Sequence, residues 1–205
     1  MNKDNKNIKN DKEIRMLAKN FRATEDEDKM IIEGYAVIFD SIGHGAYFDE
    51  VIDRNAFNGA DMKDVALKYN HDDTHLILAR TRNNSLELIV DDVGLKVRAE
   101  LIDTTNNVDI YKSIKSGLLD KMSFAFTVAE QSWDLKSDPE LRKILKIDKL
   151  YDVSVVDTPF YDSTSIYARA LESLDSEKRK LDSLKEKQLL KRKRLKLKTI
   201  IEGGI

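Results

Sequence analysis

Alternating apolar and polar residues predict that much of the chain is extended. Apolar-rich stretches at residues 14–24 and 30–40 flank an acidic turn at residues 25–28, which is typical of a β-hairpin. Further along, Asn-Asn and Asp-Asp-Val-Gly turns separate short extended segments and predict an antiparallel meander. Its strands are residues 65–71, 75–80, 85–92 and 94–101. Later strands are predicted at residues 121–133, 144–150 and 151–160, the last of which Pro159 ends.

Three segments have helical spacing instead. Residues 53–64 have Asn and Asp near their start and predict a short helix. Residues 104–119 repeat apolar side chains at helical intervals. From Ala168 there is no Gly or Pro until Gly203, and leucines recur at spacings of three and seven residues, so a long amphipathic helix is predicted. The pattern predicts an α+β fold that is mainly β, with a helical tail.

The 205 residues suffice for one domain with a core and one or two appendages. We expect a disordered polar segment at residues 1–12, a domain at 13–168 and a basic amphipathic helical tail at 169–205. Residues 169–198 contain 12 basic and 5 acidic side chains, whereas the whole chain has a net charge of -2. The body is therefore acidic and the tail basic.

The chain has no cysteine, which excludes disulfides, thiolate metal sites and a cysteine nucleophile. Its polar N-terminus lacks the apolar core of a signal peptide, and no apolar run approaches the length of about 18 residues that spans a membrane. A cytosolic, soluble protein is expected, and any nucleophile in it is an oxygen.

Three histidines could act as the base that a serine nucleophile needs at neutral pH: His44, His71 and His75. His71 ends a predicted strand, where its side chain can point into a groove, although a structural role is also open. The spacing of His71 and His75 suits a metal only on a helix, and Asp-Asp-Thr between them indicates a turn. His44 lies between two glycines and is read as a loop residue.

Two strands hold candidate partners for such a base. Alternation places Ser123 on the same face as small neighbours, which leaves room for a peptide, although a strand serine can equally be structural. Asp152 and Ser154 share one face of their strand. Asp152 could orient a catalytic imidazole, or it could pair with one of the many lysines.

Several segments, taken together and in order, resemble the prohead (procapsid) protease family of tailed bacteriophages. The fold of this family is similar to that of the herpesvirus assemblin proteases. The segments are 32–39 (IEGYAVIF), 48–52 (FDEVI), 56–57 (AF), 69–72 (YNHD), 78–80 (LAR), 92–95 (DVGL), 116–117 (SG), 122–126 (MSFAF) and 151–156 (YDVSVV) ahead of Pro159. The resemblance spans about residues 20–168.

The resemblance implies a serine endopeptidase that needs no cofactor or metal. Ser123 in Met-Ser-Phe is the implied nucleophile and His71 in Asn-His-Asp the implied base. Asp152 is the implied third member. Assemblins use a second histidine at this third position. The alternatives to Asp152 are therefore His75 and, as further acidic candidates, Asp148 and Asp157. The implied fold is a closed antiparallel β-barrel with surrounding helices and a long C-terminal helix.

The resemblance also implies substrates and a place of action. The substrates would be the scaffold, the scaffolding segment of the major capsid protein and the protease itself, inside the procapsid in the host cytoplasm. A homodimer is compatible with the resemblance, no membrane is involved, and the acidic body argues against direct binding of nucleic acid.

Two other functions stay open at this point. The chain could be a catalytically inactive scaffold or capsid-assembly protein of the same fold, or a metal-dependent hydrolase that uses His71 and His75. The basic tail could be a solvated helix end, or it could dock on acidic scaffold or capsid helices and be removed by self-cleavage.

Overall fold

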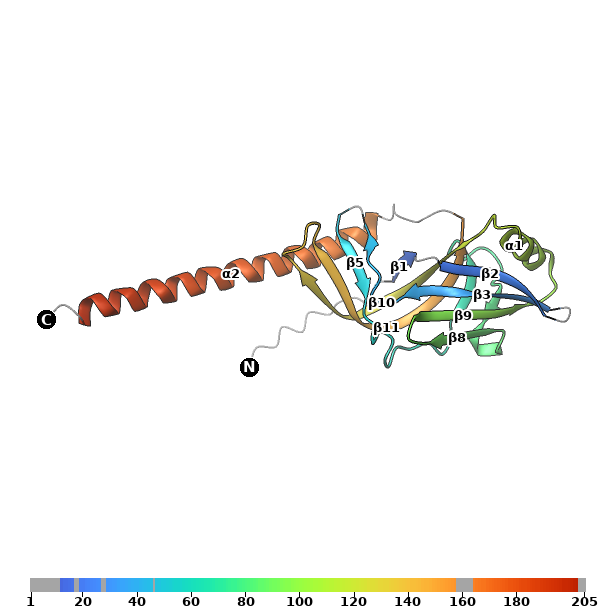
Figure 1. Ribbon diagram of the computed structural model, residues 1–205, viewed down its shortest axis with the longest axis horizontal. Coiled ribbons are helices and arrows are strands. Elements are labelled where there is room, and N and C mark those ends of the chain that lie inside the picture. Colours follow the sequence, from blue (N-terminus) through green and yellow to red (C-terminus); the bar gives the residue numbers. More distant parts are fainter. Residues whose placement is uncertain (1–11, 17–18, 27–28, 46, 158–163, 203–205) are drawn as a thin grey trace. The chain divides into compact units, whose positions relative to one another are not determined.

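The computed structural model describes residues 12–16, 19–26, 29–45, 47–157 and 164–202. The chain divides into two compact units, Met1–Asp162 and Ser163–Ile205. All strands of the described residues lie in the first unit, and the second contains one long helix (Figure 1). The segment 1–12, predicted to be disordered, lies outside the described residues except for Lys12, which contacts Asp152.

The larger sheet is organised around two long antiparallel strands, β10 and β11. In the described residues its strands are β1 (Glu13–Met16), β4 (Gly43–His44), β5 (Asp49–Ile52), β6 (Ala66–Tyr69), β7 (Ala79–Arg80), β10 (Lys121–Asp134) and β11 (Leu141–Val156). β1 lies along the free edge of β10, whereas β5 and β6 pair in parallel with two different stretches of β11. The sheet therefore places β1 beside the part of β10 that contains Ser123.

The smaller sheet has four antiparallel strands in the order β2-β3-β9-β8. They are β2 (Lys19–Asp26), β3 (Lys29–Ile38), β8 (Leu86–Val90) and β9 (Gly94–Leu101). β9 begins with a glycine because β3 passes very close there: a Cβ at Gly94 would lie 1.9 Å from the carbonyl oxygen of Val37.

Apolar side chains from the two sheets form one buried core. β10 contributes Phe124 and Phe126, whose rings stack with centroids 4.8 Å apart. The helix α1 (Thr105–Lys115) begins at Thr104, whose side chain accepts a hydrogen bond from the backbone of Asn107. This confirms the helix predicted at residues 104–119. A short 3₁₀ helix, η1 (Thr81–Asn83), precedes β8.

The predicted closed barrel is wrong, although an α+β fold that is mainly β is confirmed. Among the described strands, the path β1-β10-β11-β5-β4 and the path β2-β3-β9-β8 each end in unpaired edges, and no backbone pairing joins them. The structure is therefore two open sheets rather than one closed ring.

The predicted meander is also wrong as a single sheet. The hairpin β6-β7 belongs to the larger sheet, where β6 runs parallel to β11, and the hairpin β8-β9 belongs to the smaller one. Similarly, the strand predicted at residues 14–24 is two strands in different sheets, β1 and β2. The hairpin predicted around the acidic turn at residues 25–28 is present as the antiparallel pair β2-β3. Local alternation gives extended backbone but does not say which sheet a strand joins.

The helix predicted at residues 53–64 is replaced by successive turns. The side chain of Asp53 accepts a hydrogen bond from the backbone of Asn55, and Gly59 adopts a φ of 81°. Asp side chains compete in this way with helical hydrogen bonds, and left-handed backbone ends a helical turn. The strands predicted at residues 144–150 and 151–160 are in fact one strand, β11, which ends at Val156. The predicted end of the strand at Pro159 lies outside the described residues.

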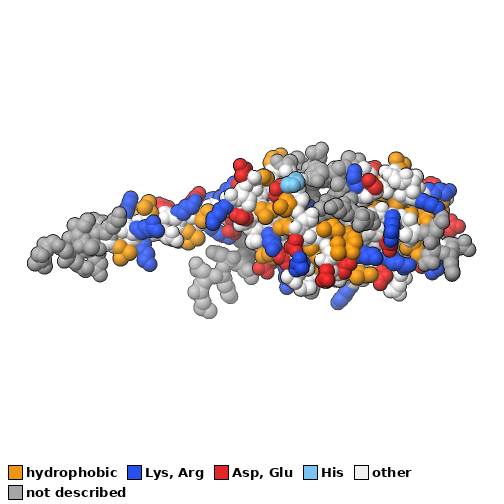
Figure 2. Space-filling model, in the orientation of Figure 1, with side chains coloured by type: hydrophobic (Ala, Val, Ile, Leu, Met, Phe, Trp, Pro, Cys, Tyr) orange, Lys and Arg blue, Asp and Glu red, His pale blue; other side chains and the backbone are white. Residues whose placement is uncertain are grey.

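The second unit confirms the long helix of the tail as α2 (Thr164–Glu202). Figure 2 shows Lys and Arg side chains spread along the part of α2 whose side chains are described. None of the described helices is both long enough and apolar enough to cross a lipid bilayer.

Candidate active site

Ser123 lies near the start of β10, at the point where β1 and β11 flank that strand. Its cross-strand neighbour on β11 is Ser154, and its side chain is fully buried. Strand alternation directs it away from the apolar face formed by Met122 and Phe124. Ser123 is therefore positioned by a strand that is paired on both sides rather than by a loop.

His71 reaches Ser123 from the tight turn that follows β6. Asn70 and His71 have φ values of 51° and 56°, a left-handed conformation that Asn and His tolerate better than most residues. The backbone N–H of Asn70 donates to the carbonyl of Val155, and its side-chain oxygen accepts from the N–H of Asp157. The turn is thus fastened to the end of β11, beside Ser123.

The imidazole of His71 joins the other two predicted residues. Its Nε2 lies 2.6 Å from Oγ of Ser123 and its Nδ1 lies 2.5 Å from Oδ1 of Asp152. The three residues are far apart in the sequence, and His71 and Ser123 alone are separated by 52 positions. Parallel pairing of β6 with β11 and antiparallel pairing of β10 with β11 bring them together.

Asp152 is ionised in this arrangement. Burial opposes its charge, but the hydrogen bond and the charge of His71, together with those of Lys12, outweigh burial and lower the pKa of Asp152 to about 2. Nζ of Lys12 lies 2.5 Å from the second oxygen, Oδ2. A carboxylate that keeps its charge next to Nδ1 fixes the tautomer in which Nδ1 donates and Nε2 is free to accept.

Ser154 adds a further hydrogen bond to the group. Its Oγ donates to Oδ1 of Asp152 over 3.0 Å and lies 3.1 Å from Nδ1 of His71. Both Ser154 and Asp152 are fully buried on the same face of β11, as the alternation predicted. A buried serine, histidine and aspartate in this order have the geometry in which histidine removes the proton of a serine that attacks an acyl group.

A family model provides independent support for this chemistry. The model for the caudovirus prohead serine protease matches residues 18–179, most of the chain. The chain belongs to this family. It is accordingly a serine protease of the procapsid type, as the resemblance implied. The matched range 18–179 contains His71, Ser123 and Asp152.

Among solved structures, the chain is similar to the capsid assembly protease gp21 of bacteriophage T4. The TM-score is 0.48 at 10% sequence identity, with 72% of this chain and 98% of that chain covered. No curated protein sequence matches this chain.

The structure does not bring the alternative third residues to His71. His75 is exposed and its Nδ1 contacts Oδ2 of Asp72 over 2.6 Å. Asp148 accepts a hydrogen bond from Thr127, and Asp157 accepts one from Tyr69. His44 lies on β4 and contacts Asp49. Only Asp152, among these candidates, has a hydrogen bond to the imidazole.

The donor set does not suit the metal-dependent alternative. Both ring nitrogens of His71 are within hydrogen-bonding distance of Ser123 and Asp152, and His75 contacts Asp72 instead of sharing a site with His71. Among the residues that the structure describes, no group of three or more His, Asp or Glu side chains could hold a metal ion.

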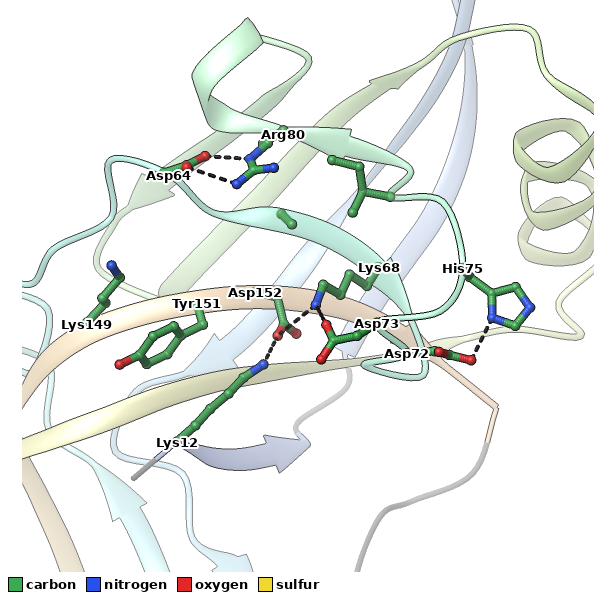
Figure 3. Close-up of a pocket in the computed structure, with 12 residues that line it drawn as sticks. Lys12, Asp64, Lys68, Asp72, Asp73, His75, Arg80, Lys149, Tyr151 and Asp152 are labelled. Atoms are coloured by element: carbon green, nitrogen blue, oxygen red, sulfur yellow. Dashed lines mark hydrogen bonds and ion pairs between the residues drawn. The ribbon is translucent and has the colours of Figure 1, made fainter. Parts of the chain in front are cut away.

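A pocket of about 460 Å³ reaches the outer side of the triad. Figure 3 shows Lys12 and Lys68 directed at Asp152 in this pocket, with His75 and Arg80 at its margins. Neither Ser123 nor His71 lines it. It therefore opens on the Asp152 end of the triad, and Ser123 is covered by β1 instead.

Several residues of the site were not predicted from the sequence. Lys12 lies in a segment that was expected to be disordered, and Ser154 was noted only as a neighbour of Asp152. Strand alternation in YDVSVV does place both Asp152 and Ser154 on one face, so that pattern contained a signal for Ser154. No local pattern indicates that Lys12 pairs with a carboxylate 140 positions away.

Proposed function

We propose that the chain is the endopeptidase that processes the procapsid interior, with Ser123 as nucleophile, His71 as general base and Asp152 as the residue that orients His71. The observation that best supports this assignment is that the imidazole of His71 lies within hydrogen-bonding distance of Ser123 on one side and of Asp152 on the other. The family match supports the same reaction.

In the first half of the reaction, Oγ of Ser123 bonds to the carbonyl carbon of a substrate peptide while Nε2 of His71 takes its proton. The carbonyl oxygen becomes an anion, and the charge of Asp152 stabilises the imidazolium. Nε2 then gives the proton to the peptide nitrogen, the carbon–nitrogen bond breaks, and the amine leaves. The acyl half remains as an ester on Ser123.

In the second half, water replaces the amine. Nε2 of His71 takes a proton from the water as its oxygen bonds to the ester carbon. The proton returns to Oγ of Ser123 as the ester bond breaks, which releases the new carboxyl terminus and restores the enzyme. No cofactor takes part in either half.

We assign as substrates the scaffold, the scaffolding segment of the major capsid protein and the protease itself. Membership of a prohead protease family supports action within the procapsid. Removing these segments would free internal volume for DNA, and peptide hydrolysis makes the step irreversible.

Co-expression with the cognate capsid protein tests the proposal. Wild-type protein should shorten the capsid protein, as intact-mass measurement reports, and Ser123→Ala should leave it at full length. Ser132→Ala is the matched control because Ser132 lies exposed on the same strand, β10, and it should behave as wild type. Full-length capsid protein with wild type as well as with Ser123→Ala would leave only the inactive assembly role. Shortening by Ser123→Ala would mean that another residue is the nucleophile, and loss of cleavage with a chelator would favour the metal hydrolase.

For α2 we propose a docking role on acidic scaffold or capsid helices, followed by removal through self-cleavage. The described part of α2 has exposed leucines among its basic residues, a surface that suits an acidic amphipathic helix. The exposed leucines are Leu181, Leu184, Leu189, Leu190 and Leu195. Deleting residues 170–205 should reduce incorporation into procapsids, and unchanged incorporation would rule out this role.

A further inference from the structure

The strand β1 covers the catalytic serine. It pairs antiparallel with β10 so that Met16 lies opposite Ser123 and Arg15 opposite Phe124. β1 is the edge strand on this side of the sheet. An extended peptide would find the same backbone donors and acceptors on β10 if β1 moved away, because edge strands bind peptides by adding a strand.

The backbone of β1 also contacts the nucleophile itself. Oγ of Ser123 donates a hydrogen bond to the carbonyl oxygen of Arg15 over 2.8 Å, while Nε2 of His71 lies 2.6 Å from the same Oγ. A hydroxyl has one proton, so a proton given to Arg15 is not given to His71. The carbonyl group of Arg15 therefore lies against the hydroxyl of Ser123, where the carbonyl group of a residue before a scissile bond would also have to lie, and the hydrogen bond takes the proton away from His71.

Two charged side chains of β1 form ion pairs with charged residues of the strands β5 and β11. Arg15 donates from Nε and Nη2 to the two carboxylate oxygens of Glu50, which β5 holds in a buried position. Glu13 accepts two hydrogen bonds from Arg142, at 2.6 Å and 2.9 Å. Glu13 and Arg15 lie on one face of β1 because they are two residues apart.

Glu50 and Arg142 form a built site rather than a surface contact. Arg142 is 2% exposed, donates to Glu50 over 2.9 Å and also donates to Gln131 over 2.6 Å. Burial opposes the charge of Glu50, but Arg15 and Arg142 outweigh it and lower the pKa of Glu50. The fold thus holds the anion Glu50 next to the cation Arg142. Glu50 pairs with Arg15 and Arg142 pairs with Glu13, so each charge of β1 meets the opposite charge.

We propose that β1 is an internal substrate mimic, and that Glu50 and Arg142 determine specificity by selecting arginine before the scissile bond and glutamate two residues earlier. This inference rests on the proposed function, since it names the substrate class of the same site. It also makes the described state a self-inhibited one, in which β1 must leave β10 before another peptide can bind.

Full-length protein with Glu13→Gln and Arg15→Gln tests the inference. Glu13→Gln keeps the side-chain size and Arg15→Gln shortens the side chain. Both leave the backbone of β1 able to pair while removing the charges that hold β1. The probes are acetyl-Glu-Ile-Arg and acetyl-Gln-Ile-Gln, each joined to an aminocoumarin leaving group. The double variant should cleave the charged probe about tenfold faster than wild type and prefer it over the neutral probe by about 100-fold in kcat/KM. Adding Glu50→Gln should remove this preference.

Equal cleavage of the two probes, or no gain over wild type, would overturn the inference. Arg15→Gln alone serves as a milder variant, with circular dichroism and thermal melting to show that each chain is folded. Labelling of Ser123 by a fluorophosphonate tests the serine protease assignment separately from the specificity sites. Labelling without probe preference rejects the specificity sites and keeps the protease. A folded double variant with neither labelling nor cleavage rejects the proposed function as well.

Discussion

Two buried carboxylates lie on either side of β1, and their surroundings differ. Asp152 contacts His71 and Ser154, residues of the fold itself, and receives Lys12 on its outer oxygen. Glu50 contacts Arg142 of the fold but also receives the side chain of Arg15 from β1. In the proposed mechanism Asp152 orients the base, whereas in the proposed specificity site Glu50 pairs with a charged side chain of a peptide. The two proposals thus assign chemistry and recognition to separate anions.

The largest loss of peptidase activity is expected for a substitution of His71. His71→Asn removes the base while keeping a residue that tolerates the positive φ of the turn. Activity on every peptide should fall by about 10⁴-fold, because the triad acts as a unit. The matched control is His75→Asn, an exposed histidine four residues on, which should change kcat/KM less than about twofold. Peptide hydrolysis measures both, and equal rates for the two variants would contradict the assignment.

Asp152→Asn should lower kcat by about 10³-fold, because an amide can donate to Nδ1 and stabilise the wrong tautomer. It should also weaken the fold in a pH-dependent way. The pKa of Asp152 is about 2 in the folded chain, against an ordinary value of 3.8. The ionised carboxylate therefore stabilises the fold fully above about pH 4 and loses this effect as the pH falls towards about 2.

Urea unfolding of the two proteins at several pH values measures this dependence. Wild type should exceed Asp152→Asn by about 2 kcal/mol near neutral pH, and the difference should narrow in acid. A difference that grows as the pH falls would mean that the carboxylate is not held in its ionised form.

At Glu50 and its partner Arg142, substitutions are expected to lower the stability of the fold rather than the reactivity of Ser123. Arg142→Met leaves Glu50 without its fold partner and should lower the free energy of unfolding by about 3 kcal/mol. Combining it with Glu50→Gln should cost less than the sum of the two single changes, because the buried charge is then gone. Fluorophosphonate labelling of Ser123 should persist in the double variant. Strict additivity would show that the two residues do not act as a pair.

The smallest effect is expected at Ser154, whose hydroxyl contacts Asp152 and His71. Ser154→Ala removes a hydrogen bond to Oδ1 of Asp152. We expect kcat to fall by about tenfold, equivalent to the loss of about 1.4 kcal/mol, with KM unchanged. Steady-state kinetics separates the two constants. A rise in KM alone would assign Ser154 to peptide binding instead.

Local patterns predicted α1, α2 and β10 because a helix or strand is specified by neighbours along the chain. They did not predict that residues 14–24 split between two sheets or that β6 runs parallel to β11, since those pairings depend on distant segments. The resemblance pointed to Ser123, His71 and Asp152, while Lys12, Arg15 and Arg142 were missed. Each of these three acts through a partner more than 30 positions away.

The central claim is that Ser123 is a nucleophile activated by His71. The most direct measurement is the intact mass of the full chain after prolonged exposure to a fluorophosphonate, followed by peptide mapping of the adduct. The account predicts one adduct per chain, located on Ser123, and none in the otherwise folded His71→Asn protein. An adduct on another residue, or equal labelling of wild type and His71→Asn, would contradict it.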